Sequence, residues 1–154
     1  MFKEMRRKDK KLDNAKALRI LEAGQYGILS TTGSSGYAYG LPISYTYGNG
    51  CIYFHCAVDG QKLDNIKFNN KVSFCVVGNA IPLPQSFSMI YESVIAFGKA
   101  LEVFAGEKQA TLEAIVAKYS PAFTKEGLEY IKSSLGNTRI FKIEIEHMTG
   151  KAGR

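Results

Sequence analysis

A strand, a glycine turn and the start of a helix follow one another in Tyr53-Phe54-His55-Cys56-Ala57-Val58-Asp59-Gly60-Gln61-Lys62-Leu63. Backbone N–H groups at the start of a helix have no partner inside it, and together with the positive end of the helix dipole they favour a bound phosphate. Gly60 permits close approach of the backbone, and Lys62 adds a full positive charge. The alternative is a simple turn followed by a solvated lysine, and the spacing alone leaves both interpretations open.

Strand patterns lie on both sides of this segment. Upstream, Gly33-Ser34-Ser35-Gly36 and Gly48-Asn49-Gly50 are turn sequences, because Gly and Asn accept positive φ. They separate runs rich in aromatic and β-branched residues, and further apolar runs follow downstream. Together these patterns predict six strands, at residues 26–32, 37–47, 51–55, 71–78, 89–104 and 138–147.

Helices are predicted between these strands. Asp13 is a candidate N-cap and Gly24 a C-terminal stop for the first of them. Ser120-Pro121 divides the last two, because a residue that precedes proline avoids helical geometry. The expected helices cover residues 14–23, a short run at 63–67, and residues 107–119 and 125–134.

Most strands are joined by turns rather than by crossover helices, which favours an α+β, mainly β fold: a six-stranded barrel with short helices. Pro82 and Pro84 predict a loop over 79–86. With 154 residues and 45% hydrophobic content, the chain is long enough for one core and too short for two independent domains. We therefore expect a single domain over 1–154, in which residues 1–12 form a basic tail.

Charge and cysteine content narrow the classes of function. The net charge is +6, yet residues 1–19 hold eight Lys or Arg against three acids, so the excess lies near the N-terminus and nucleic-acid binding is not expected. No stretch reaches the roughly 20 apolar residues of a membrane span. Cys51, Cys56 and Cys75 form no Cys-x-x-Cys pair and are odd in number, which favours reduced thiols in the cytoplasm. We expect no metal site.

The pattern Tyr-Phe-His-Cys-Ala-x-x-Gly-x-Lys-Leu over residues 53–63 is preceded by Gly40-Leu41-Pro42-Ile43-Ser44-Tyr45. Further motifs extend along nearly the whole chain: Met5-Arg6-Arg7-Lys8-Asp9, Tyr91-Glu92-Ser93-Val94, Phe97-Gly98-Lys99-Ala100 and Thr149-Gly150-Lys151. Taken together, they resemble the pyridoxamine 5′-phosphate oxidase-like split-barrel flavoproteins, specifically the nitroimidazole-resistance-protein-like branch.

The resemblance implies a homodimeric split barrel with FMN bound between the two subunits. Carried over residue by residue, the cofactor contacts are Pro42, Ile43 and Ser44 along the flavin ring, His55, Cys56 and Ala57 at its border, Gly60 and Lys62 at the phosphate, Glu92 and Ser93 from the partner subunit, and Lys151 from the C-terminal segment. The oxidases that make pyridoxal phosphate carry an Arg-rich C-terminal motif. This sequence ends Lys151-Ala152-Gly153-Arg154 without it, so vitamin B6 synthesis is not expected.

The implied activity is flavin-dependent reduction of a small acceptor such as a nitroaromatic or quinone-like compound, because a flavin supplies the chemistry and the protein positions it. His55 is the candidate catalytic residue, which either donates a proton or only shapes the site. Cys56 is adjacent on the strand and should point to the opposite face, which argues against a Cys/His catalytic pair.

The alternative is a non-catalytic protein that stores FMN or carries haem. A haem would need His55 or His147 as its axial histidine, since the sequence contains no other. We expect His147 to be a surface residue at the end of the last strand.

Overall fold

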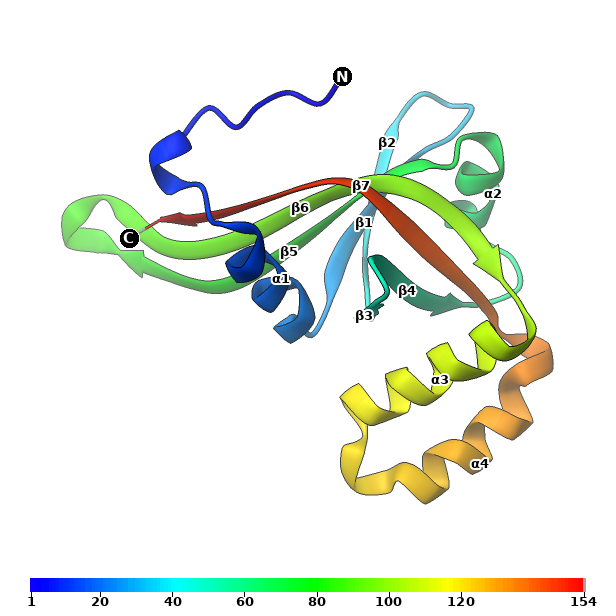
Figure 1. Cartoon of the computed structure of the whole chain (residues 1–154). Coiled ribbons are helices and arrows are strands. Elements are labelled where there is room, and N and C mark those ends of the chain that lie inside the picture. Colours follow the sequence, from blue (N-terminus) through cyan, green and yellow to red (C-terminus); the bar gives the residue numbers. More distant parts are fainter. Residues whose placement is uncertain (154) are drawn as a thin grey trace.

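Seven antiparallel strands form one open sheet in this computed structural model, which describes residues 1–153. In chain order they are β1 (Gly27–Thr32), β2 (Ala38–Ile43), β3 (Thr46–Gly48), β4 (Cys51–Cys56), β5 (Lys71–Leu83), β6 (Ser88–Val103) and β7 (Arg139–Gly153). Their spatial order is β2-β1-β5-β6-β7-β4-β3. The two edge strands, β2 and β3, are separated in sequence only by Ser44 and Tyr45, so the sheet curls until its edges approach each other at this corner (Figure 1). The mainly β fold is therefore confirmed.

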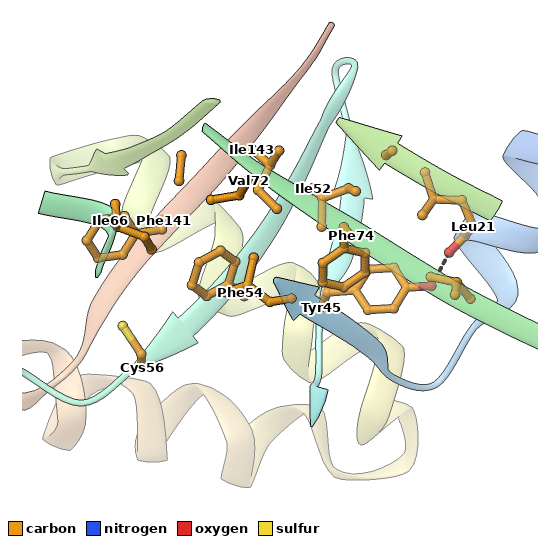
Figure 2. Close-up of a cluster of buried hydrophobic side chains, with 14 of the residues drawn as sticks. Leu21, Tyr45, Ile52, Phe54, Cys56, Ile66, Val72, Phe74, Phe141 and Ile143 are labelled. Carbon is orange, nitrogen blue, oxygen red and sulfur yellow. Dashed lines mark hydrogen bonds between the residues drawn. The ribbon is translucent and has the colours of Figure 1, made fainter. Parts of the chain in front are cut away.

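The count of six strands is wrong, because the expected strand over 37–47 is divided into β2 and β3. At the division, the backbone of Tyr45 bonds to side chains rather than to a neighbouring strand. Its N–H donates to Tyr119 Oη at 3.0 Å, and its carbonyl oxygen accepts from Lys118 Nζ at 3.0 Å. The Tyr45 hydroxyl donates to the carbonyl oxygen of Leu21 (Figure 2). Contacts with residues of two helices thus fix the corner, and they cannot be predicted from the residues around Tyr45 alone.

The predicted loop over 79–86 is also wrong for most of its length. β5 continues to Leu83 and pairs with β6 after one bulge, so the two strands form a long hairpin that extends beyond the rest of the molecule (Figure 1). Past Cys75, the other side of β5 is a free edge, because β1 ends its pairing there. A proline on a free edge removes no ladder hydrogen bond, so Pro82 is accommodated inside the strand.

The last strand, β7, runs past its predicted end at His147 and reaches Gly153. Its second half is specified by pairing with β6 rather than by its own alternation of polar and apolar residues. The two strands approach so closely at Gly98 that a Cβ there would lie 2.1 Å from the carbonyl oxygen of Glu144, so glycine is needed. His147 consequently lies half-buried inside a strand and not at a strand end.

Four α-helices connect or flank the strands: α1 (Asn14–Ala23), α2 (Gln61–Phe68), α3 (Ala105–Tyr119) and α4 (Thr124–Ser134), with one-turn 3₁₀ helices at Lys8–Lys10, Pro84–Ser86, Pro121–Phe123 and Leu135–Asn137. The predicted cap of α1 is confirmed, since the Asp13 carboxylate accepts from the N–H of Lys16 at 2.8 Å. The α3–α4 hairpin is inserted between β6 and β7, and α3 contacts β3 and β4 (Figure 1). Among residues 1–153, no helix has the length and apolarity needed to cross a membrane.

Two apolar clusters share β4 and explain why most of this strand is buried. Ile52, Phe54 and Cys56 point into the main cluster inside the curled sheet (Figure 2). Cys51 and Tyr53 point the other way, into a smaller cluster with residues of α3 and α4. The only side chain of β4 that is left exposed comes one residue before the strand ends, at His55.

The basic N-terminal residues lie along β7. Lys11 forms an antiparallel bridge with Lys151, and the N–H of Leu12 donates to the carbonyl oxygen of Gly150 at 3.0 Å. Cationic side chains from near the two ends of the described chain therefore come together.

Candidate cofactor site

The end of β4 presents its side chains alternately to solvent and to the core. His55 is exposed, whereas Cys56 is buried in the main apolar cluster with its Sγ 3.7 Å from the carbonyl oxygen of Arg139. Ala57, the next residue, is exposed again. The structure thus separates the imidazole from the thiol, as alternation along a strand requires, and only the backbone of Cys56 is available to a ligand on the outside.

Lys62, in the first turn of α2, reaches back toward this strand end. Desolvation by the surrounding chain lowers the pKa of His55, and the positive charge of Lys62 lowers it further, so the ring is neutral at pH 7. Desolvation raises the pKa of Cys56, and Lys62 opposes that rise. The thiol therefore remains protonated and is a poor nucleophile.

Gly60 is the N-cap of α2, with φ of 139°, a value that side-chain-bearing residues rarely adopt. A Cβ at this position would have no neighbour within 4 Å, so the space above the turn is open. No side chain caps the helix. The N–H groups of Leu63 and Asp64 donate to the carbonyl oxygen of Gly60, at 3.1 and 3.2 Å. Within the described chain this leaves the N–H groups of Gln61 and Lys62, together with the Lys62 ammonium group, free to hold an anionic group.

The end of β2 contributes residues of two kinds. Pro42 is exposed and pairs in register with Ile28 of β1. Ile43 is half-buried and packs against the main apolar cluster, while Ser44 begins the corner that leads to β3. Of these three, Pro42 and Ser44 can offer side-chain atoms to a ligand on the outer surface.

A second group of predicted site residues lies on β6 and β7. Ser93 is directly opposite Lys151 in the sheet, on the outer face. Glu92 points to the inner side, where its carboxyl group lies against Gly78 and faces α1. Ser93 and Lys151 therefore form a group of their own, and Glu92 lies on the other face of the sheet.

The two groups are far apart within one chain. His55 pairs with Ile140 of β7, and Ser93 pairs with Lys151 of the same strand. At about 3.3 Å per residue, these pairs are separated by on the order of 35 Å along β7. Figure 1 places α2 and the free end of the β5–β6 hairpin on opposite sides of the molecule. One chain therefore brings the predicted site residues together as two half-sites, not as one.

Two residues beside these half-sites, Arg139 and Tyr91, were not predicted from the sequence. Arg139 forms a bidentate ion pair with Glu102, at 2.7 and 2.9 Å, and Nη1 lies 3.3 Å from the carbonyl oxygen of Val58, next to the glycine turn. These partners are remote in sequence, so no local pattern signals them. At the other half-site, Tyr91 lies between Lys10 and Lys151, whose Nζ atoms are 5.8 and 5.3 Å from its ring centroid.

The charges around Tyr91 change the acidity of its phenol. A hydrogen bond with Lys151 lowers the pKa of Tyr91, and the positive charges of Lys151, Lys10 and Arg7 act in the same direction. The motif Tyr91-Glu92-Ser93-Val94 could have pointed to this residue, since it belongs to the same stretch as two predicted site residues. No group of His, Cys, Asp and Glu suited to a metal ion occurs among residues 1–153.

The structure is thus a small, curled antiparallel sheet with an open glycine turn between β4 and α2 and a lysine in the first turn of α2. The chain belongs to the pyridoxamine 5′-phosphate oxidase family, whose model matches residues 13–152. No curated protein sequence matches the chain.

Solved structures with the same fold are numerous. One, from Bacteroides thetaiotaomicron VPI-5482, carries a provisional assignment as a 5-nitroimidazole antibiotic resistance protein; it is 24% identical, with a TM-score of 0.80 over 92% of this chain and 86% of its own. An FAD- and haem-binding protein from Mycobacterium smegmatis is 15% identical, with a TM-score of 0.81 over 94% and 74%. An FAD-binding protein from Mesorhizobium loti is 18% identical, with a TM-score of 0.68 over 94% and 98%.

Proposed function

We propose that this protein is a homodimeric, cytoplasmic FMN-dependent reductase that acts on a small acceptor such as a nitroaromatic compound of the nitroimidazole type. The observation that carries the proposal is the turn at Gly60, which is open, uncapped and flanked by Lys62, in a member of the pyridoxamine 5′-phosphate oxidase family. The three free cysteines suit a reducing compartment.

The half-site at β4 and α2 would hold the cofactor. The Lys62 ammonium group and the N–H groups of Gln61 and Lys62 would bind the phosphate. His55, Ala57 and the backbone of Cys56 would border the ring, together with Pro42, Ser44 and the backbone of Ile43. When bound, FMN supplies two-electron transfer to an acceptor. The neutral imidazole of His55 can shape the ring pocket and accept or donate a hydrogen bond without adding charge.

A second copy of the chain would complete the site. Because Ser93 and Lys151 are too distant from His55 to serve the same ligand within one chain, their participation requires a partner. The outer face of β5 and β6, on the hairpin side of the cavity residues, supports such an interface, since Val77 and Ile95 lie exposed on it. Large exposed apolar patches commonly mark protein–protein contacts, and an obligate interface of this kind buries on the order of 2,000 Å² or more.

The acceptor class is supported by the fold shared with the provisionally assigned 5-nitroimidazole resistance protein. The experiment has two stages. First, the absorbance of the purified protein, alone and titrated with FMN, should show flavin bands that remain with the protein on gel filtration. Second, the FMN-loaded protein, supplied with a nicotinamide or dithionite reductant, should reduce a nitroimidazole faster than free FMN does. Absence of retained FMN, or turnover no faster than that of free FMN, would overturn the proposal.

A non-catalytic binding protein is the second candidate, favoured by the shared fold of the FAD- and haem-binding protein. Within the described chain, His147 is stacked on Phe2 with ring centroids 4.8 Å apart, which leaves exposed His55 as the better axial ligand. A Soret band after addition of haem, lost in His55→Ala, would support this candidate. Tight FMN binding without acceptor turnover would instead support an FMN store.

A further inference from the structure

A cavity of about 510 Å³ opens on the outer face of the sheet, beside β1, β5 and β6. This volume lies within the range of about 300–1,000 Å³ that is usual for small-molecule sites. None of the residues that the family resemblance assigns to the cofactor lines it. The cavity is therefore distinct from the predicted cofactor contacts.

Two lysines face each other at this cavity. Lys71 on β5 is directly opposite Lys99 on β6, and both side chains line the cavity and are exposed. Cβ atoms of such cross-strand pairs are about 4.5–5.5 Å apart, and like charges in this position destabilise a sheet. Neither lysine forms an ion pair with any carboxylate of residues 1–153. An anion bound between the two ammonium groups would offset their repulsion.

Acidic residues near the lysines limit the charge of that anion. Glu144 is opposite Lys99 in the sheet, on β7, and Glu146 lines the cavity. Among the side chains that line the cavity, the two lysines and Glu146 leave one net positive charge. This balance matches a monoanion, such as a carboxylate, better than a phosphate dianion.

One wall of the cavity is aromatic. Phe2 and Phe97 both line it, with ring centroids 5.4 Å apart and planes tilted by 33°, and both rings remain more than a third exposed. Phe2 is held in place by its stack on His147, whose ring plane differs by 3°. Aromatic surfaces of this kind favour offset or edge-to-face contact with a planar ring. Ser30 and Ser73, which are cross-strand partners, add hydroxyl groups to the same cavity.

We propose that this cavity binds a planar aromatic carboxylate. The carboxylate lies between Lys71 and Lys99, and the aromatic ring packs against Phe2 and Phe97. FMN also has a planar ring and an acidic group. Binding of FMN in this cavity therefore has to be distinguished from binding of an aromatic carboxylate. The inference does not depend on the proposed reductase activity, because it concerns binding by residues outside the flavin half-sites.

The test is isothermal titration calorimetry of the purified protein with 4-nitrobenzoate and with its neutral analogue 4-nitrobenzyl alcohol, both without flavin and at saturating FMN. We expect the carboxylate to bind at least about tenfold more tightly than the alcohol, because charge-assisted hydrogen bonds form only with the former. In Lys71→Met/Lys99→Met the preference should disappear. In the matched control Lys67→Met/Lys125→Met, which removes two exposed lysines on α2 and α4, it should persist.

A conservative variant tests the aromatic wall. Phe97→Leu should weaken both compounds and leave the preference for the carboxylate intact. Equal binding of the two compounds to the unmodified protein, or a preference that survives in Lys71→Met/Lys99→Met, would overturn the inference. Loss of FMN binding in that double variant, with nitrobenzoate binding unchanged, would also overturn it and assign the lysines to the flavin phosphate. Failure of the unmodified protein to bind FMN would overturn only the reductase proposal.

Discussion

Lys62 on α2 lies close enough to His55 on β4 for its ammonium group to add to the desolvation that lowers the pKa of the imidazole. Replacing it by methionine should therefore raise the pKa of His55 toward the ordinary value of about 6.5. The measurement is an NMR titration of the imidazole C–H resonances. Lys67→Met, near the opposite end of the same helix, is the control and should leave the His55 titration unchanged. An unchanged pKa in Lys62→Met would show that the two side chains do not interact.

Because the pKa of His55 is lowered, the free energy of unfolding should decrease as the pH falls. Between the pKa of folded His55 and about pH 6.5, the unfolded chain binds more protons at this position than the folded chain does. The contribution of His55 to the free energy of unfolding is therefore present above pH 6.5 and is lost as the pH falls through this window.

Lys62 should also discriminate between flavins. If its ammonium group binds the phosphate, Lys62→Ala should weaken FMN binding about tenfold or more, which corresponds to about 1.4 kcal/mol or more. Riboflavin lacks the phosphate and should bind with little change. Quenching of flavin fluorescence measures both affinities, and Lys67→Ala is the matched control. Equal losses for the two ligands would place Lys62 away from the phosphate.

His55 is expected to shape the ring pocket rather than to transfer a proton. His55→Gln should then retain much of the reductase rate and remove no limb of the pH profile, because water can protonate the product. A general acid would instead contribute about 10²–10⁴-fold in rate. Steady-state kinetics across pH 5–8, with FMN occupancy checked by absorbance, separate the two roles. A large loss of rate at full occupancy, with a vanished pH limb, would show that the expectation is wrong.

The outer face of β6 is expected to hold two copies together. Ile95→Asp places a charge on this face, and burial of an unpaired carboxylate in an apolar interface is costly, so the dimer should dissociate. Leu128→Asp on α4 is a matched control, since Leu128 and Ile95 are 37% and 41% exposed. Sedimentation equilibrium at micromolar concentration gives the mass. A monomeric unmodified protein, or an intact dimer in Ile95→Asp, would contradict this interface.

The corner between β2 and β3 is expected to depend on one hydroxyl group. Tyr119 Oη accepts from the N–H of Tyr45 at 3.0 Å and lies 2.7 Å from the carbonyl oxygen of Gln25, to which it can donate. Tyr119→Phe should therefore cost about 1–2 kcal/mol in the free energy of unfolding, measured with urea. Tyr130→Phe, at an exposed tyrosine of the neighbouring helix, should cost little. Equal effects of the two changes would remove this role from Tyr119.

Local sequence patterns predicted the features that depend on short-range physics. Asp13 caps α1 as expected, Gly60 precedes α2, and Ser120-Pro121 divides α3 from α4. Alternation along the strand predicted that His55 and Cys56 point to opposite faces, and the structure places them so. In each case the determining interaction spans only a few residues, so the sequence carries it directly.

Other features were missed because distant residues decide them. The corner at Tyr45 depends on Lys118 and Tyr119, and the second half of β7 depends on its pairing with β6. The expected loop around Pro82 became a strand because β1 leaves that edge of β5 free. The residues of the candidate site were predicted from the sequence and the family resemblance. Their separation into two half-sites depends on the pairing of β4 and β6 with opposite ends of β7, which the sequence does not reveal.

The position of β7 has a consequence for how the chain can fold. β7 is the last strand in sequence, yet it is the only link in the sheet between β6 and the β4–β3 pair. During synthesis, β4 must therefore wait unpaired on that side until residues 139–144 have left the ribosome, and the apolar side chains that it carries stay accessible in the meantime. Long-range pairing of this kind slows folding and exposes intermediates to aggregation. Removal of the first six residues of β7 should therefore leave β3 and β4 without a sheet to join.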